Sequence, residues 1–514
     1  MSIASLELGG AAAELRRRPR GFKRAGVLLA GGALSGCVAG LAVAGNSTST
    51  VVAFMALLVI VAVWIRPQLG PVLIFAVGLA IEGFSIGAVS SSGVSINPPL
   101  TESIPMFQGL GPIHAEPADL LPFVILAIYM IRSGGEVRRW WPRSQISLAV
   151  GALMACALFA EVQGVVLHHG AIRESLFEVR PLVYIGTSYL VTAVMIRTRG
   201  AVQAMLWALV IIEPFKAVQG VYVWLETKNW NPKPQTVLGH EEAMFFTVYF
   251  LLVAALWLFG VHGRMRKFAT WCTPLVFFAD LVNDRRAAWL VLGFGFIVVM
   301  VAAYRALPEK QQKIRRASMA IIVIFGLYLG AFWGHTAGTL GAPADAVRSQ
   351  FSPSARDALS DEYRIDEDAN LKFNIKNAGP IGEGFAKEID YALPMPGLVT
   401  AGDSGIMYVP HNGVLYLLMR MGILGGTAYW ALLGVGILAA CRLTRLRNRE
   451  SAVIGAVIAA SLVGWAIEGA TDMGFTFPRE AIVMGCLLGL VEAVRHIEIE
   501  SHRRASGYAD ARTA

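Results

Sequence analysis

Residues 452–470 read AVIGAVIAASLVGWAIEGA, and Glu468 is the only charged side chain in that run. A helix needs roughly 20 consecutive apolar residues to cross about 30 Å of membrane hydrocarbon, and this run comes close to that length. Lipid offers no hydrogen-bond partner to a free backbone amide, so the run is expected to be helical. The stretch therefore predicts a membrane-spanning helix and indicates the class of the fold.

Similar apolar runs recur along the chain from Val27 to Glu492, with short charged links between them. The chain is 55% hydrophobic and 16% charged, whereas a soluble domain carries about 25% charged residues. The short alternating segments of a membrane β-barrel do not occur in the sequence. The sequence thus predicts an all-α, polytopic transmembrane helical bundle of about 12 to 14 crossings. The expected spans are 27–45, 51–65, 69–89, 118–132, 145–167, 178–197, 201–224, 243–261, 268–282, 286–304, 318–336, 422–441, 452–470 and 478–495.

Basic residues are concentrated in alternate links, which is the pattern expected of the cytoplasmic side. They precede the first apolar run at Arg16, Lys23 and Arg24, and they recur at 305–316 and 442–449. No clear cleavage site follows the basic N-terminus, so we expect an uncleaved first helix. The chain is therefore predicted to be a multi-pass protein of the inner (cytoplasmic) membrane, with both termini in the cytoplasm.

The one long polar segment of the chain falls on the outer side in this topology. It has more acidic than basic side chains, and a loop of this length without a strong helical pattern is usually functional or disordered. The predicted parts are a basic cytoplasmic N-terminus (1–26), transmembrane helices (27–336), an extracytoplasmic loop with a motif helix (337–421), C-terminal transmembrane helices (422–495) and a disordered cytoplasmic tail (496–514).

Ionisable side chains inside the predicted spans are costly in lipid and point to function. Most of them fall in the outer halves of the spans or at their outer ends. Any single one could be a helix-end residue that reaches water, but as a group they favour a polar cavity near the outer surface. They are Glu82, Glu161, Glu213, Lys216, Asp280 and Glu468 within the spans, and Arg173, Arg180, Arg285, Arg286, Asp472 and Arg479 at the outer ends.

The sequence offers no pattern of metal ligands or disulfides. Its 5 cysteines are isolated, and none belongs to a CxxC pair, so neither a zinc site nor a disulfide framework is supported. His168, His169 and the run His240-Glu241-Glu242 have no third ligand at metal spacing, and we read them as surface residues. We expect no metal, no cofactor and no nucleic-acid partner.

The end of the long polar segment carries the strongest motif. It reads PHNGVL at 410–415, followed by RMGILGG at 420–426. This pattern resembles the bacterial O-antigen ligase and O-antigen polymerase superfamily, in which a His-Asn pair precedes a Leu and a Gly-x-x-Gly opens the next transmembrane helix. RRAA at 285–288, YR at 363–364 and GPIGEGF at 379–385 look like further family motifs in the same order. The chain departs from the family at Arg285, where Ser is usual, and at Met421, where an acidic residue is common.

The resemblance implies a metal-independent glycosyltransferase that takes a glycan from a polyprenyl diphosphate at the outer membrane surface. It implies that His411 is the base for an acceptor hydroxyl, because histidine titrates near the working pH, and that Asn412 assists it. Arginine matches phosphate oxygens with a planar fork, and Arg286 is preferred over Arg285 because it falls on the family's Arg. Further diphosphate ligands are expected at Arg180 and Arg173, and other substrate contacts at Arg364 and Lys216.

Several interpretations stay open at this point. The acceptor of the glycan could be a lipid core, a growing glycan or a protein Ser or Thr, which correspond to a ligase, a polymerase and a protein O-oligosaccharyltransferase. A transporter or flippase of envelope precursors is an alternative, for which interrupted helices in matched halves would be expected. A scaffold that binds envelope glycans is a third. Gly382 and Gly384 are read as turn glycines, and membrane lipids surround the protein under every interpretation.

Overall fold

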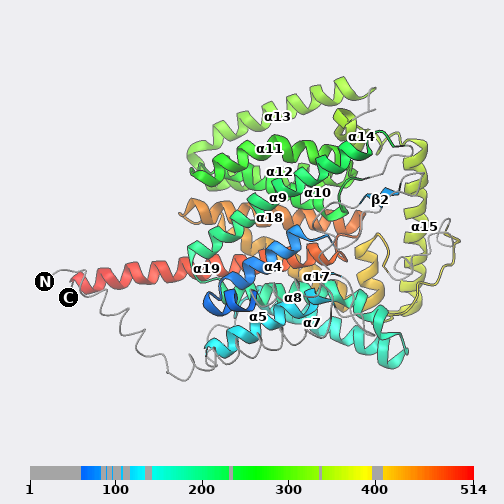
Figure 1. Ribbon diagram of the computed structural model, residues 1–514, viewed down its shortest axis with the longest axis horizontal. Helices are drawn as coiled ribbons and strands as arrows, with labels where there is room; N and C mark the ends of the chain where they lie inside the picture. The colour runs from blue at the N-terminus through cyan, green and yellow to red at the C-terminus, as the bar shows by residue number, and fades with distance from the viewer. Residues whose placement is uncertain are drawn as a thin grey trace, which may run out of the picture. The chain divides into compact units, whose positions relative to one another are not determined.

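The computed structural model describes residues 59–82, 88–89, 95–96, 106–107, 116–133, 142–230, 236–334, 339–395 and 409–513. These residues are predominantly helical (Figure 1). The only strands among them are β1 (Ala88–Val89) and β2 (Ser95–Ile96), which pair antiparallel. The all-α class is therefore confirmed for the described part of the chain, while the predicted span at 27–45 lies outside it.

Seven of the described helices are long and apolar enough to cross a membrane. This finding supports a membrane protein and leaves the full number of crossings as a prediction. The seven are α7 (Gln145–Val162) continued by the π-turn η1 (Gln163–Leu167), α9 (Arg199–Thr227), α10 (His240–Leu258), α12 (Arg286–Ala306), α13 (Gln311–Phe332) preceded by η2 (Pro308–Lys310), α17 (Gly413–Leu443) and α18 (Arg449–Thr471).

Residues 51–58 of the predicted span 51–65 lie outside the described residues. Five further predicted spans fall, wholly or in part, on helices that are shorter or more charged. They are α4 (Leu69–Ala80), α5 (Pro117–Ser133), α8 (Ile172–Met195), α11 (Arg264–Asn283) and α19 (Pro478–Thr513). Helix α4 ends nine residues earlier than the predicted span 69–89, because the chain turns at Ile81 and Glu82.

Helix α19 continues to Thr513, so the tail that was predicted to be disordered is helical up to that residue. There Glu498 accepts hydrogen bonds from Asn448 (2.8 Å) and Ser451 (2.7 Å), which tie α19 to α18 beyond the predicted span.

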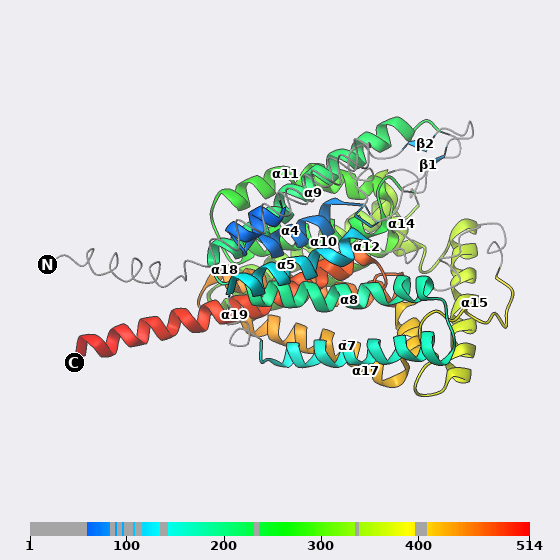
Figure 2. The same ribbon diagram turned by 60° about the horizontal axis from the view of Figure 1, so that its bottom comes forward.

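The chain forms two compact units, 1–70 with 123–141 and 71–122 with 142–514. In the first unit the described residues 59–65 are helical, and the Arg132 side chain donates to the Trp64 carbonyl. In the second unit the long helices lie side by side (Figures 1 and 2), with α18 packed against α10, α12 and α17. The apolar window of α18 is 83% buried and that of α13 only 6%, so α18 is a core helix and α13 presents its apolar side chains outward.

The predicted extracytoplasmic loop contains regular structure that the sequence pattern did not show. A turn η3 (Thr339–Gly341) and α14 (Ala342–Arg348) precede the 24-residue helix α15 (Ala355–Ala378). Helix α15 crosses the ends of the bundle helices instead of running beside them (Figures 1 and 2). Its buried side is the stripe Glu367, Asn370, Leu371 and Asn374, at helical spacing of three and four residues.

Helix α17 is interrupted at Gly422, whose φ of 63° and ψ of −166° are not helical. The segment 379–386, which we call the strap, fills the interruption. The Glu383 N–H donates to the Met419 carbonyl (2.9 Å), and the Ile423 N–H donates to the Pro380 carbonyl (2.9 Å). The strap thus takes up backbone groups that the break in α17 would leave unpaired. The break at Gly422 lies at the predicted boundary, 421/422, between the motif helix and the membrane helix.

The turn glycines of the strap are confirmed. Gly382 and Gly384 have φ of 79° and 81°, a conformation that glycine adopts without penalty. A Cβ on Gly384 would lie 2.4 Å from the Gly164 nitrogen. At both positions φ is positive and the backbone of another segment lies close to the glycine.

Replacing Gly422 with alanine is expected to destabilise the protein. An alanine there would hold a strained φ, which costs about 1–3 kcal/mol, and its Cβ would lie 2.3 Å from the Pro380 oxygen. Gly434→Ala is the matched control in α17, because a Cβ at Gly434 meets nothing within 4 Å. Thermal unfolding in detergent should show a clear loss for Gly422→Ala and none for Gly434→Ala. Equal unfolding temperatures would contradict the described strap contact.

Candidate functional site

His411 lies directly before α17, with its side chain 31% exposed and held by Glu367 of α15. The His411 backbone N–H donates to Glu367 Oε2 (2.9 Å), and the imidazole Nδ1 lies 3.2 Å from Glu367 Oε1. The Tyr363 ring meets the imidazole edge-on at 5.7 Å between centroids. A carboxylate at Nδ1 fixes the ring orientation and the proton on that nitrogen, which leaves the Nε2 lone pair available.

The surroundings of His411 raise its pKa above the ordinary value. Burial disfavours the charged imidazolium, but the hydrogen bond and negative charge of Glu367 and the charge of Asp472 outweigh it, against a lowering effect of Arg364 on the same pKa. Burial raises the pKa of Asp472, but the positive charge of Arg364 and the hydrogen bond from the Met473 N–H help to lower it below its usual value. The site therefore keeps an ionised carboxylate close to an imidazole.

Asp472 caps the C-terminal end of α18 and brings together side chains from three other elements. Its Oδ2 lies 4.0 Å from His240 Nδ1 of α10 and 4.0 Å from Arg364 Nη2 of α15. Arg285, the residue before α12, is also within the field of Asp472. Burial lowers the pKa of Arg285 to about 10, and the charge of Asp472 opposes that shift. We call His240, Arg285, Arg364, Glu367, His411 and Asp472 the candidate site.

The two adjacent arginines of the RRAA motif face different neighbours. Arg285 belongs to the candidate site, and its Nε has no hydrogen-bond partner within the described residues. Arg286 Nη2 instead lies 3.8 Å from Asp361 Oδ1 of α15. Arg285 is the N-cap of α12 and has an extended backbone conformation, whereas Arg286 is the first helical residue. Arg285 therefore faces the charge of Asp472 and Arg286 that of Asp361, and which of the two binds diphosphate stays a prediction.

Asn412 is the N-cap of α17. Its Oδ1 accepts from the Leu415 N–H (3.1 Å), which satisfies a free amide of the first turn. Its Nδ2 donates to Asp368 Oδ1 of α15 (3.0 Å). Asn412 therefore positions His411 by fixing both helices, and a catalytic role for its amide stays a prediction.

Three other basic residues that the sequence singled out lie in different surroundings. Arg180 is buried in an ion pair of its own, with Nη1 2.8 Å from Glu116 Oε1 and Nε 2.9 Å from Asp119 Oδ1. Lys216 is fully buried against Glu82 and Glu242. Arg173 is exposed in the first turn of α8. The roles of these three residues as diphosphate or substrate ligands stay predictions. For Arg180 or Lys216 to bind a ligand, the ion pairs described above would have to open.

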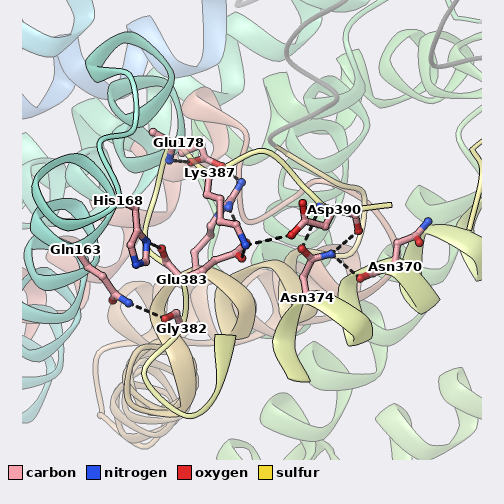
Figure 3. Close-up of polar contacts among 11 residues, drawn as sticks. Gln163, His168, Glu178, Asn370, Asn374, Gly382, Glu383, Lys387 and Asp390 are labelled. Atoms are coloured by element: carbon pink, nitrogen blue, oxygen red, sulfur yellow. Dashed lines mark hydrogen bonds and ion pairs between the residues drawn. The ribbon is translucent and has the colours of Figure 1, made fainter. Parts of the chain in front are cut away.

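The strap is anchored beneath the candidate site by a buried arginine. Arg420 Nη2 lies 2.6 Å from Glu178 Oε1 of α8, and its Nη1 lies 2.8 Å from Glu383 Oε1 of the strap. Lys387 completes the charge balance with its Nζ 2.9 Å from Glu383 Oε2, and Figure 3 shows this pair beside Glu178. Breaking such a buried pair typically costs about 3–5 kcal/mol, so Arg420 has a structural role.

Side-chain amides hold the strap and the segment that follows it. Gln163 of η1 donates to the Gly382 carbonyl of the strap (2.7 Å), and Asn374 of α15 donates to the Asp390 carbonyl (2.8 Å), as Figure 3 shows. Asn370 of α15 also donates to the Leu393 carbonyl (3.0 Å). The strap is therefore bound to η1 and α17, and the segment after it is bound to α15, the helix that carries Glu367.

The prediction that the run His240-Glu241-Glu242 lies on the surface is wrong for the two glutamates, whereas the His240 side chain is 43% exposed. Glu241 is 2% exposed and Glu242 is 0% exposed, because α10 starts with its first turn inside the bundle. The sequence reasoning also missed Glu367. One usable signal was its spacing of one helical turn from the Tyr363-Arg364 motif.

Comparison with known proteins adds no family to this picture: no family model matches the chain, and no curated protein matches it significantly. The resemblance to the O-antigen ligase and polymerase superfamily therefore stays a prediction.

Proposed function

We propose that the protein is a glycosyltransferase, similar to the O-antigen ligases, that joins a polyprenyl-diphosphate-linked glycan to an acceptor hydroxyl without a metal ion. The observation that carries the proposal is the His411–Glu367 pair together with Asp472, whose charge acts on His411, Arg364 and Arg285, at one end of a membrane-type helical bundle. A base and two guanidinium groups at one place fit a reaction that needs proton removal and a diphosphate leaving group.

Each group has a defined task in this reaction. His411 Nε2 takes the proton from the acceptor hydroxyl as its oxygen attacks the anomeric carbon of the donor. The bond between that carbon and the diphosphate oxygen breaks, and the diphosphate leaves with the electron pair. Arg285 and Arg364 stabilise the negative charge that develops on it. Glu367 holds His411 in the orientation that the proton transfer requires.

The test of the proposal is transfer in a purified system. Protein in detergent or vesicles is given a synthetic polyprenyl-diphosphate glycan and a panel of acceptors, with and without EDTA. Transfer that survives EDTA is expected. Loss of transfer on chelation with recovery by magnesium would mean that the arginines are not the main counter-charge. The acceptor that works distinguishes a ligase, a polymerase and a protein O-oligosaccharyltransferase.

The proposal includes a topology with about 14 crossings, both termini in the cytoplasm and α15 outside. Ser352 and Gln312 are exposed and suit a labelling test. In a cysteine-free background, Ser352→Cys should react with an impermeant thiol reagent added from outside, and Gln312→Cys should react only after the membrane is opened. Labelling of both from the same side would contradict this topology.

A transporter or flippase of envelope precursors is the second candidate, and one observation favours it. Lys216, Glu82, Glu242 and Arg479 form ion pairs inside the bundle, and charged groups inside spans often mark transport pathways. The two functions differ in their need for His411. His411→Ala should abolish transfer of glycan in a transferase and leave flipping intact in a flippase.

A further inference from the structure

Six glutamates lie buried in one region of the bundle, between the candidate site and the middle of α9. In the part of the chain that the structure describes, two cations, Lys216 and Arg479, are buried among them. Uncompensated charge in the interior costs several kcal/mol per ion, so the balance of charges here decides which carboxyls are ionised. The six are Glu82, Glu213, Glu241, Glu242, Glu468 and Glu480.

The two cations are balanced by two of these carboxylates in a closed ring. Arg479 Nη1 lies 3.0 Å from Glu82 Oε2, and Arg479 Nη2 lies 2.5 Å from Glu242 Oε1. Lys216 Nζ contacts Glu82 and lies 3.2 Å from Glu242 Oε1. Two positive and two negative side chains make the ring neutral.

The other carboxyls have no cation of their own. Glu480 Oε2 accepts from Trp465 Nε1 (2.7 Å), while its Oε1 has no donor and its carboxyl faces that of Glu468. Glu241 Oε2 has only a distant contact, 3.6 Å, with Arg479, which the ring already neutralises. Arg285 at the candidate site can offset one further charge. Most of the remaining carboxyls must therefore be neutral, which means that they hold protons.

Glu213 is the clearest case, because neither of its carboxyl oxygens has a hydrogen-bond partner in the described residues and its exposure is 0%. It lies in the middle of α9 and faces the ring. The charge of every group of the ring acts on Glu213. The Tyr249 phenol of α10, which donates to the Ala269 carbonyl, is also within the range of its charge. A buried carboxyl beside a ring that is already neutral can bind a proton, but it has no cation to balance a negative charge.

We propose that Glu213 binds a proton in the interior of the bundle, and that the buried carboxyls link it to Asp472 so that protons pass between the interior and the candidate site. Glu241 and Glu242 lie in the first turn of α10 and both contact Arg479 of α19, at 3.6 Å and 2.5 Å. Glu480 follows Arg479 in α19 and accepts a hydrogen bond from Trp465 of α18, the helix that also carries Glu468. The charge of Glu242 acts on Glu213, and that of Glu241 acts on Glu468 and Glu480. Glu468 lies one helical turn before Asp472. Each carboxyl accepts one proton and releases one, so the transfer changes no other bond.

Infrared spectroscopy of the full-length protein in nanodiscs tests the protonation directly. A protonated buried carboxyl gives a carbonyl stretching band separate from that of a carboxylate. Glu213→Gln should remove part of this band at neutral pH, and Glu213→Asp should shift it, which provides a second variant if the first does not fold. Glu226→Gln is the matched control, since Glu226 is exposed on the same helix. A spectrum of Glu213→Gln identical to that of the unaltered protein would overturn the proposal.

The proposed coupling between Glu213 and the candidate site can be measured without glycan transfer. If the carboxyls are coupled, Asp472→Asn should shift the pH at which the Glu213 band titrates. An unchanged titration would show that the chain of carboxyls ends before the site and would overturn the coupling. A band that disappears on addition of sodium or potassium would assign the site to a cation and overturn proton binding. In the described ranges no group of three or more His, Cys, Asp or Glu could hold a metal ion.

Discussion

Replacing His411 with alanine is expected to reduce the turnover of glycan transfer by about 10²–10⁴-fold, the usual effect of removing a general base. The donor should still bind, because the contacts to diphosphate are assigned to Arg285 and Arg364. His411→Gln should not restore turnover, since an amide can hydrogen-bond but cannot accept the proton. The measurement is the rate of transfer at saturating donor, with folding checked by thermal unfolding.

The pH dependence of transfer gives a sharper form of the same prediction. The base must be neutral, so the rate should rise with pH through the His411 pKa and level off above it. Because Glu367 raises that pKa, the rise should lie above about 6.5, the value of an unperturbed histidine. Glu367→Gln removes the negative charge, lowers the His411 pKa and should move the rising limb to lower pH. The plateau should also fall, because the imidazole loses its orientation.

His262→Ala is a suitable control, since His262 is exposed at the other end of α10, beside Arg266. It should leave both rate and pH profile unchanged. If His411→Ala instead lost donor binding and kept its turnover at saturation, His411 would be a diphosphate ligand. The base would then have to be sought among Glu161, Asp280 and Asp403, of which Asp403 lies outside the described residues.

Arg285→Ala is expected to weaken donor use by about 10- to 100-fold. A hydrogen bond to a charged group contributes about 1.5–3 kcal/mol, and 1.4 kcal/mol corresponds to a factor of ten. Arg285→Lys should recover only part of the loss, because an ammonium group cannot make the two parallel bonds of a guanidinium. The measurement is kcat/KM for the lipid-linked donor.

Arg286→Ala provides the comparison, because Arg286 is adjacent in sequence but faces Asp361. Its loss should be smaller than that of Arg285→Ala. A larger loss for Arg286→Ala than for Arg285→Ala would instead assign diphosphate binding to Arg286, as the family motif suggests. Full activity of Arg285→Ala would remove Arg285 from the site.

The sequence predicted the helices well where burial in lipid or in the bundle demands apolar residues. The run at 452–470 lies within α18, and all the spans from 118–132 onward fall on helices. Helix α15 escaped this reasoning, because its buried stripe includes Glu367, Asn370 and Asn374. Hydrophobic periodicity cannot detect a helix whose hidden side chains are polar.

The site was predicted in part, and the gaps have physical reasons. The motif placed His411 at a helix start, and in the structure the charge of Asp472 acts on His411, Arg364 and Arg285. Glu367 is 44 residues away from His411 in the chain, and nothing in the sequence fixes which side of α15 faces it. The role of Lys216 in substrate binding stays a prediction. Its ion-pair partners are Glu242 of α10 and Glu82, which follows α4, and a single sequence does not pair them.

The contacts between α15 and the bundle restrict the insertions and deletions that α15 can accept. Asp361, Arg364 and Asp368 reach Arg286, Asp472 and Asn412 from neighbouring turns of one helix. Inserting a single residue within this stretch would rotate the rest of the helix by about 100° and take its later contacts out of phase. Length variation is therefore expected to occur there only in whole turns, whereas the exposed residues 350–354 before α15 can absorb insertions of any size.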